Sequence, residues 1–190
     1  GLSDGDPKRD VTARISATID RLDRLVADLL TFAHPGDQSL EWTDLVELLR
    51  EAALYVRPEF ADLDIACAEA IDKRVPELCV DREKLFQAFL NVLRNAYQAT
   101  PAGGTVTLRA ALQGSDHVSL AVHNTGSYIP AEVRVRLFHP FFTTKREGTG
   151  LGLPISHHIV RAHGGEIRVI SEPEMGTTFE IVLPAVRVGA

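Results

Sequence analysis

The chain has 190 residues, of which 45% are hydrophobic and 24% are charged, and its formal net charge is -6. This composition is typical of a globular protein with a buried core, and the length fits one domain with an appendage rather than two full domains. The acidic balance excludes a general nucleic-acid binder, which presents a basic surface. No apolar run approaches the roughly 18–20 residues that span a bilayer, and no signal-peptide pattern opens the chain.

Two further features bear on the protein's setting. The two cysteines, Cys67 and Cys79, give no disulfide framework, and we expect both to be buried, reduced thiols of a cytoplasmic protein. The chain begins at Gly1 without an initiator Met, so we expect a fragment or a processed form. The missing membrane segment then says nothing about the parent protein, which could be membrane-anchored.

Residues 8–33 are predicted to form one helix, because their seam positions alternate in spacings of four and three. These positions are Val11, Ile15, Thr18, Leu22, Leu25, Leu29 and Phe32. Pro35 and Gly36 end the helix. So wide an apolar face needs a partner, and we assign residues 1–36 to part of a helical hairpin and dimer. The alternative is that this helix packs on its own domain.

Residues 37–190 alternate between strand and helix patterns, which predicts an α/β sandwich. Asp44 and Asp81 are predicted to cap helices, and Gly164 is predicted to end the last one. Helices are expected at about 44–56, 81–99 and 150–163, with a short one opening at Pro130. Strands are expected at about 40–42, 63–70, 78–80, 105–112, 117–123, 166–171 and 177–183.

Two asparagines, Asn91 and Asn95, lie four residues apart on the predicted helix 81–99, so both amides project from one face. Asparagine disfavours the interior of a helix, so a pair there calls for an explanation. Amide oxygens suit Mg²⁺, which takes few protein ligands and completes its shell with water and nucleotide phosphates. The pattern therefore predicts a metal site. The alternative is a pair of amides that are solvated or satisfied in the core.

The segment Asn124-Thr125-Gly126 directly follows the predicted strand 117–123. A polar side chain at a strand end can contact the edge of a flat ligand, and a following glycine lets the backbone come close. Because Asn-Thr-Gly is also ordinary turn chemistry, a ligand contact and a plain turn both stay open.

Residues 143–153 form a glycine-rich loop that leads straight into a helix. The amides of a helix's first turn are unpaired and carry partial positive charge, so they can bind phosphate. Lys145 and Arg146 add cations that could reach terminal phosphates. The spacing fits neither a Walker A motif nor a dinucleotide fingerprint. A glycine-rich hinge without a ligand is the alternative.

Three motifs occur in a fixed order: an Asn-x-x-x-Asn helix, an Asn-x-Gly strand end and a Gly-x-Gly-x-Gly helix start. Together they resemble the nucleotide-binding boxes of sensor histidine kinases. Residues 137–145 resemble the family's phenylalanine box, and the details are most similar to kinases of the nitrogen-regulator type. The resemblance is to the ATP-binding catalytic domain of the gyrase, heat-shock, histidine-kinase and mismatch-repair ATPase superfamily, over roughly residues 40–185. It implies an α/β two-layer sandwich, a mixed sheet covered on one face by three helices, preceded by one long dimerisation helix.

The resemblance also implies a role for each matching residue. Asn95 would bind Mg²⁺, Asn91 would assist at the metal and the phosphates, and Asn124 would face the adenine amino group of ATP. Thr177 would lie by the adenine, and Asn91 and Lys145 would serve the phosphoryl transfer. The remaining implied ATP contacts are Gly126, Gly148, Thr149, Gly150, Leu151 and Gly152.

Two positions depart from the family pattern, in which Asn124 is normally Asp and Tyr128 is normally glycine. An Asp side chain only accepts hydrogen bonds, whereas Asn keeps one acceptor and turns its other end into a donor. We therefore expect ATP binding that is weakened by roughly 1–3 kcal/mol rather than abolished. On the same reasoning, the substitution Asn124→Asp should tighten it.

The family phosphorylates a histidine that is followed by Glu or Asp, and none of the seven histidines has that neighbour. We expect the acceptor helix upstream of Gly1. The resemblance thus implies a kinase domain that transfers the γ-phosphoryl group of ATP to that histidine, for relay to an aspartate of a response-regulator receiver domain. It also implies a homodimer formed through the N-terminal helix in the full-length protein.

Two other functions stay open at this point. Asn124 and Tyr128 would suit a degenerate scaffold that binds partners but no nucleotide. A serine/threonine kinase or a plain ATPase of the same superfamily is the other possibility, and the predicted helix 8–33 argues against it.

Overall fold

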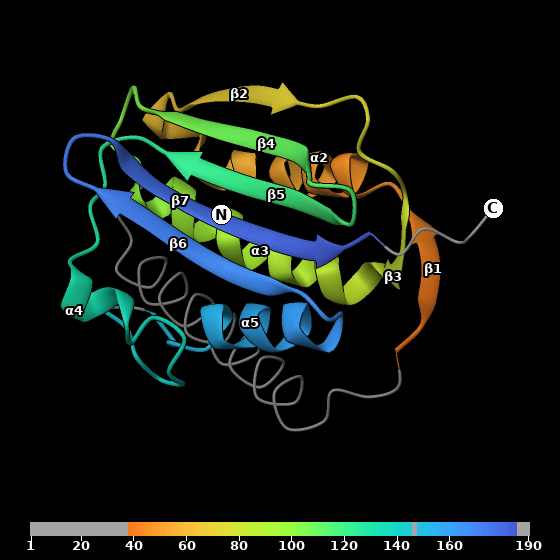
Figure 1. Cartoon of the computed structure of the whole chain (residues 1–190). Coiled ribbons are helices and arrows are strands. Elements are labelled where there is room, and N and C mark those ends of the chain that lie inside the picture. The colour runs from red at the N-terminus through yellow and green to blue at the C-terminus, as the bar shows by residue number, and fades with distance from the viewer. Residues whose placement is uncertain (1–37, 146–147, 186–190) are drawn as a thin grey trace, which may run out of the picture. The chain divides into compact units, whose positions relative to one another are not determined.

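The computed structural model describes residues 38–145 and 148–185 (Figure 1). In chain order its elements are β1 (Leu40–Thr43), α2 (Leu45–Val56), the 3-10 helix η1 (Arg57–Leu63), β2 (Ala66–Ile71), β3 (Leu78–Asp81), α3 (Arg82–Ala99), β4 (Thr105–Gln113), β5 (His117–Asn124), α4 (Ala131–Arg134), α5 (Gly152–Ala162), β6 (Glu166–Glu172) and β7 (Gly176–Pro184). The predicted helix 8–33 and its assignment to a hairpin lie outside the described residues. In the part of the chain that is described, no helix combines the length and the apolar character that a membrane crossing requires.

The sheet layer contains five strands in the order β2-β4-β5-β7-β6. Strand β2 pairs with β4 in parallel, whereas β4 with β5, β5 with β7 and β6 with β7 pair antiparallel. The sheet is therefore mixed, as predicted. Strands β1 and β3 form a separate antiparallel pair.

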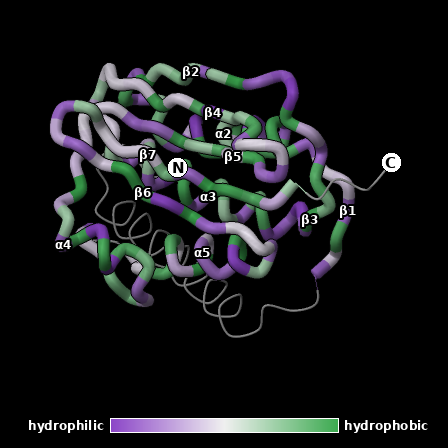
Figure 2. Tube along the Cα trace, viewed as in Figure 1, coloured by the Kyte–Doolittle hydropathy of each residue, from purple (hydrophilic) through white to green (hydrophobic). Residues whose placement is uncertain are grey.

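Helices α2, α3 and α5 form a second layer on one face of the sheet, with α3 in contact with both of the others (Figure 1). Buried side chains recur every three or four residues along α3 and at alternate positions along β4, so both elements turn an apolar side inward. Members of this core include Leu85, Phe89, Leu93, Val106, Leu108, Leu120 and Ile181. Figure 2 shows hydrophobic stretches along the inner strands and a hydrophilic connection between β2 and β3. The predicted two-layer sandwich is confirmed.

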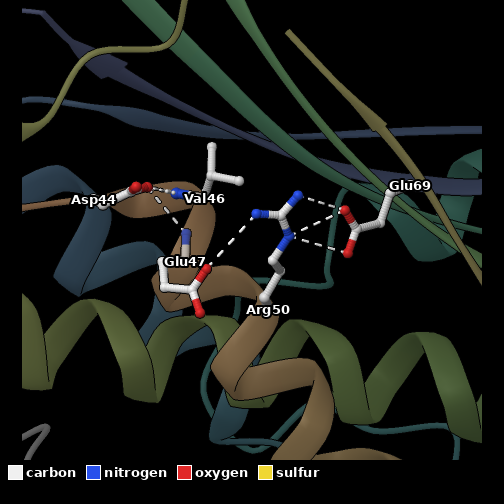
Figure 3. A network of polar contacts seen from close by, with 5 residues as sticks. All are labelled: Asp44, Val46, Glu47, Arg50 and Glu69. Carbon is white, nitrogen blue, oxygen red and sulfur yellow. Dashed lines mark hydrogen bonds and ion pairs between the residues drawn. The ribbon is translucent and has the colours of Figure 1, made fainter. Parts of the chain in front are cut away.

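The starts of α2 and α3 are fixed by the predicted aspartate caps. Asp44 Oδ1 accepts hydrogen bonds from the backbone N–H groups of Val46 and Glu47 at 2.9 and 3.0 Å (Figure 3). Asp81 Oδ1 accepts one from the N–H of Lys84 at 3.0 Å. Caps of this kind typically contribute about 1 kcal/mol each to stability.

Helix α2 is tied to the edge strand β2 by Arg50. Its guanidinium binds both carboxylate oxygens of Glu69, with the closest contact at 2.7 Å (Figure 3). The hydrogen bond from Arg50 lowers the pKa of the Glu69 carboxyl. Because the pair is exposed, it fixes the position of the helix against the strand more than it stabilises the fold.

Two parts of the fold differ from the prediction. Residues 57–63 form η1, so β2 begins at Ala66 rather than near residue 63. Both cysteines are free, but both are exposed, so the prediction of buried thiols is wrong. Cys67 lies on the edge strand β2, and Cys79 occupies the outward position of β3 between buried Leu78 and Val80.

The C-terminal end of α5 is fastened to the start of α3 by His163. Its Nδ1–H donates to the carbonyl of Ile159, at 2.8 Å, and its Nε2 accepts from the backbone N–H of Asp81 at 3.0 Å. This pairing requires a neutral ring that carries its proton on Nδ1. Gly164, with φ of +72°, follows and ends the helix as predicted.

Candidate functional site

Asn91 and Asn95 project from α3 close to the start of α5. Asn91 Nδ2 donates to the carbonyl oxygen of Gly152, the first residue of α5, at 3.1 Å. Asn95 Nδ2 donates to the carbonyl of Asn91, one turn back, at 2.9 Å. Because each side-chain nitrogen donates to a backbone carbonyl, the side-chain oxygens are the groups that these residues can offer to a cation.

Lys145 reaches this face of α3 from the loop before α5. Its Nζ donates to Asn95 Oδ1 at 2.6 Å and to Gln98 Oε1 at 2.5 Å. The residue as a whole is exposed, but its ammonium end lies among the side chains of α3. This burial lowers the pKa of Lys145 to about 8, because the ammonium loses water in exchange for neutral carboxamide oxygens. Asn95 and Gln98 thus already hold a cation.

Two glycines of the loop are required by close packing against α3 and the preceding segment. Gly150 has φ of +68°, and a Cβ there would lie 2.5 Å from the backbone carbonyl carbon of Phe141. The N–H of Phe141 donates to the carbonyl of Gly150 at 3.0 Å, which holds the loop in this shape. A Cβ on Gly152 would lie 3.3 Å from the carboxamide carbon of Asn91. A side chain at Gly150 would therefore clash with the backbone of Phe141, whereas one at Gly152 would crowd the Asn91 carboxamide.

The start of α5 has open backbone donors. Its N-cap position is Leu151, which makes no side-chain capping hydrogen bond, so the N–H groups of Gly152 and Leu153 are available to an anion, whereas Pro154 has no N–H. Leu151 has a fully buried side chain, and its N–H donates to Thr149 Oγ1 at 3.2 Å. Leu151 therefore anchors the loop in the core and does not face a ligand with its side chain. Gly148 packs against the side chain of Thr143.

Asn124, the last residue of β5, is 1% exposed. Its Nδ2 donates to the carbonyl of Thr125 at 3.2 Å and to Ser127 Oγ at 2.8 Å. Its Oδ1 is buried and has no hydrogen-bond partner. Leaving a buried acceptor unpaired costs about 1–3 kcal/mol, which a hydrogen-bond donor of a ligand would recover.

Gly126 and Tyr128 follow Asn124 in a tight turn. Gly126 has φ of +76°, and a Cβ there would lie 2.7 Å from the ring of Pro101. Glycine is therefore needed at this position both for its backbone angle and for the close approach of the proline. Tyr128 is half-exposed, so the turn accommodates its ring at the surface.

Thr177 lies opposite Asn124 in the register of β5 and β7, and it is 1% exposed. Its Oγ1 accepts from Ser127 Oγ at 2.9 Å and lies 2.8 Å from Ser171 Oγ. The hydroxyl of Thr177 is therefore joined to Asn124 through Ser127.

Most of the predicted residues fall into two clusters, whereas Gly148, Thr149, Gly150 and Leu151 belong to neither and form the loop before α5. The helix-face cluster consists of Asn91, Asn95, Gln98, Lys145 and Gly152. The strand-end cluster consists of Asn124, Ser127, Ser171 and Thr177, with Gly126 in its turn. Sequence reasoning missed Gln98, although its place three residues after Asn95 puts it on the same helix face. It also missed Ser127, for which the turn sequence gives no separate signal.

The donor set of the helix-face cluster decides which metal it could hold. Among the described residues, no group of three or more His, Cys, Asp and Glu side chains is placed to hold a metal ion. The donors at Asn91 and Asn95 are carboxamide oxygens. Such oxygens suit a hard cation that keeps water and ligand oxygens in its shell, as Mg²⁺ does.

Comparison with known proteins places these clusters in a family. A family model described as histidine kinase-, DNA gyrase B-, and HSP90-like ATPase matches residues 80–187, which contain both clusters and make up more than half of the chain. The sensor histidine kinase ZraS of Escherichia coli (strain K12) is 36% identical over 165 residues, which cover 87% of this chain and 35% of that protein. The chain spans about a third of the length of the curated relatives it matches.

Solved structures give the same picture. Full-length ShkA in complex with AMPPNP has a TM-score of 0.84 and 30% identity, covering 100% of this chain and 41% of that chain. The histidine kinase ThkA in complex with the response regulator protein TrrA has a TM-score of 0.77 and 27% identity, covering 96% of this chain and 53% of that chain. The chain therefore belongs to the histidine kinase-, DNA gyrase B- and HSP90-like ATPase family, as a catalytic domain of the sensor histidine kinase type.

Proposed function

We propose that the chain binds ATP and transfers its γ-phosphoryl group to a histidine on a dimerisation helix of the full-length protein. The observation that carries this proposal is the meeting of three segments that lie far apart in the sequence. Asn95 of α3 accepts a hydrogen bond from the ammonium of Lys145 in the glycine-rich loop. Asn91 donates a hydrogen bond to the carbonyl of Gly152, the first residue of α5. Carboxamide oxygens, a loop cation and open helix amides are groups that serve positioning and charge neutralisation in phosphoryl transfer.

The helix-face cluster fits Mg²⁺, and we assign Asn95 as its ligand with Asn91 assisting. Asn95 Oδ1 already accepts a cation, the Lys145 ammonium, at 2.6 Å. When bound, Mg²⁺ would neutralise negative charge on the phosphates. With Asn95 Oδ1 assigned to the metal, the Lys145 ammonium would be available to the terminal phosphates.

The strand-end cluster is assigned to the adenine. Asn124 Oδ1, buried and unpaired, would accept a hydrogen bond from the adenine amino group. Gly126 would let the base lie close to the turn, and Thr177 would act beside it through Ser127. Between the two clusters, Gly148, Thr149, Gly150 and Gly152 would let the loop and the amides of α5 close on the phosphates.

The partners follow from the same proposal. ThkA, a structural relative, was solved with a response regulator protein, which supports a receiver domain as the next acceptor of the phosphoryl group. None of the seven histidines of this chain precedes an Asp or Glu, so the acceptor would be on the dimerisation helix that joins two protomers. We place the domain in the cytoplasm, where ATP and receiver domains are found.

Nucleotide titration tests the proposal. Calorimetry with ATP and Mg²⁺ should give saturable binding at one site per chain. A chain that shows no saturable binding would contradict the proposal and favour a scaffold.

Phosphorylation with labelled ATP tests where the acceptor lies. The chain alone should not form an acid-labile phosphohistidine, because no histidine in it has the acidic neighbour of an acceptor site. Labelling of the isolated chain would overturn the proposed location of the acceptor.

A further inference from the structure

The direction of the Asn124 carboxamide is set by its surroundings. One end of this side chain lies 3.2 Å from the carbonyl oxygen of Thr125. A carbonyl can only accept a hydrogen bond, so the end that faces it has to be the nitrogen. The same nitrogen lies 2.8 Å from Ser127 Oγ. Asn124 Oδ1 therefore faces the other way, where it is buried and unpaired.

The hydroxyl of Ser127 reinforces this direction, because its own proton is used elsewhere. Ser127 Oγ donates to Thr177 Oγ1 at 2.9 Å, so its free lone pair accepts from Asn124. Thr177 in turn donates to the carbonyl of Ser127, at 3.3 Å. Ser171 Oγ, which lies 2.8 Å from Thr177 Oγ1, accepts from the backbone N–H of Ile129 at 2.8 Å. Because the Thr177 proton goes to the carbonyl of Ser127, Ser171 Oγ donates to Thr177 Oγ1, and every proton of this hydroxyl chain then has an acceptor.

We infer that Ser127 is a positioning residue for base recognition: it holds the Asn124 carboxamide so that the site presents an acceptor, and it thereby selects purines with a 6-amino group over those with a 6-oxo group. The inference rests on the proposed ATP binding and names the residue that makes the base site selective. An asparagine is otherwise ambiguous, because a half-turn of its carboxamide exchanges the acceptor for a donor.

The matched pair of Asn124 and Ser127 also explains why an asparagine serves in place of the family's aspartate. A carboxylate at position 124 in the same orientation would put an oxygen against the carbonyl of Thr125. The carboxylate could bind Ser127 only by accepting a hydrogen bond from its hydroxyl, which already donates to Thr177. The hydroxyl chain is therefore arranged for a donor at this point, which asparagine has and aspartate lacks.

The test compares two nucleotides that differ at the 6-position of the base. ATP carries an amino group there and inosine triphosphate carries an oxygen, which would face Asn124 Oδ1 as a second acceptor. Calorimetry in Mg²⁺ should show that the unmodified chain prefers ATP by about tenfold to a hundredfold. In Ser127→Ala the preference should fall by about threefold, because the Asn124 nitrogen loses the closer of its two acceptors and keeps only the carbonyl of Thr125. The control Ser127→Thr keeps the hydroxyl and should keep the preference.

The outcomes separate this inference from the proposed function. If the unmodified chain binds neither nucleotide, the proposed function fails. If it binds ATP but does not discriminate, or if Ser127→Ala keeps the full preference or Ser127→Thr loses it, the proposed function stands and the role of Ser127 is overturned. Should Ser127→Ala not fold, Thr177→Val breaks the same chain one link further and should lower the preference, while Thr177→Ser should keep it.

Discussion

The two clusters differ in how firmly their hydrogen bonds are set. In the strand-end cluster, Asn124 and Thr177 are buried on paired strands, and Ser127 joins their side chains by hydrogen bonds. In the helix-face cluster, Lys145 comes from a loop and is held by neutral carboxamides, which a metal ion can take over. Under the proposed function, the comparison means that the base end would be formed before a nucleotide arrives, whereas at the phosphate end a metal ion would replace the Lys145 ammonium on Asn95.

The substitution Asn95→Ala would break the helix-face cluster most severely. Affinity for ATP in the presence of Mg²⁺ should fall on the order of a hundredfold, since the metal loses its protein ligand. Affinity measured in EDTA should stay within about twofold, because the base contacts are untouched. Gln98→Ala is the matched control on the same helix face, and it should keep the magnesium dependence. An equal loss with and without Mg²⁺ would show that Asn95 does not bind the metal.

Gly150→Ala and Gly103→Ala form a second pair, since both glycines have positive φ but different surroundings. A Cβ on Gly150 would meet the backbone of Phe141, whereas a Cβ on Gly103 would meet no atom within 4 Å. Gly103→Ala should lower the free energy of unfolding by about 1–2 kcal/mol and leave ATP affinity unchanged. Gly150→Ala should weaken ATP binding by about tenfold or more, because the loop has to change shape. Equal ATP affinities for the two variants would contradict the role given to the loop.

Asn124→Asp sharpens the description of the strand-end cluster. Comparison with the family alone predicts tighter ATP binding, but the contacts with Thr125 and Ser127 predict weaker binding by about threefold to tenfold. A dissociation constant measured by calorimetry decides between the two. Tighter binding would mean that the Ser127 hydroxyl can readily turn its proton from Thr177 to residue 124. The hydrogen bonds at this end of the site would then be less fixed than the geometry indicates.

The smallest expected effect concerns Lys145→Met. Removing the ammonium frees Asn95 Oδ1, so ADP with Mg²⁺ should bind about twofold to threefold more tightly. ATP should bind less tightly by a similar factor, since its terminal phosphate loses a cation. Lys73→Met, an exposed lysine between β2 and β3, is the control and should change neither affinity. A change of the same sign for both nucleotides would argue against the exchange of cations.

Much of the fold could be predicted because its signals are local. The aspartates at 44 and 81 cap helices, and the spacing of Asn91 and Asn95 places both on one face. The glycines at 126 and 150 were picked out by their position in motifs, and their positive φ angles give the physical reason for them. Each of these features depends on a few neighbouring residues, which is what a sequence pattern can report.

What could not be predicted depends on residues that are distant in the chain. Lys145 meets Asn95 and Gln98 across 50 and 47 positions, and Ser127 meets Thr177 across 50. No local pattern fixes which end of the Asn124 carboxamide faces outward, since a distant hydroxyl decides it. The exposure of Cys67 was misjudged for the same reason, because a strand's place at the edge of a sheet is a property of the whole topology.

The hydrogen bond between His163 and the backbone of Asp81 limits how α5 can move when a nucleotide binds. Since the C-terminal end of α5 is bonded to the start of α3, this helix cannot slide along its axis without breaking that anchor. When the loop before α5 rearranges, a tilt of the helix keeps this hydrogen bond, whereas a shift along the axis would break it and cost about 1 kcal/mol. A probe attached near Gly152 should report ligand arrival, while one near Ala162 should stay silent.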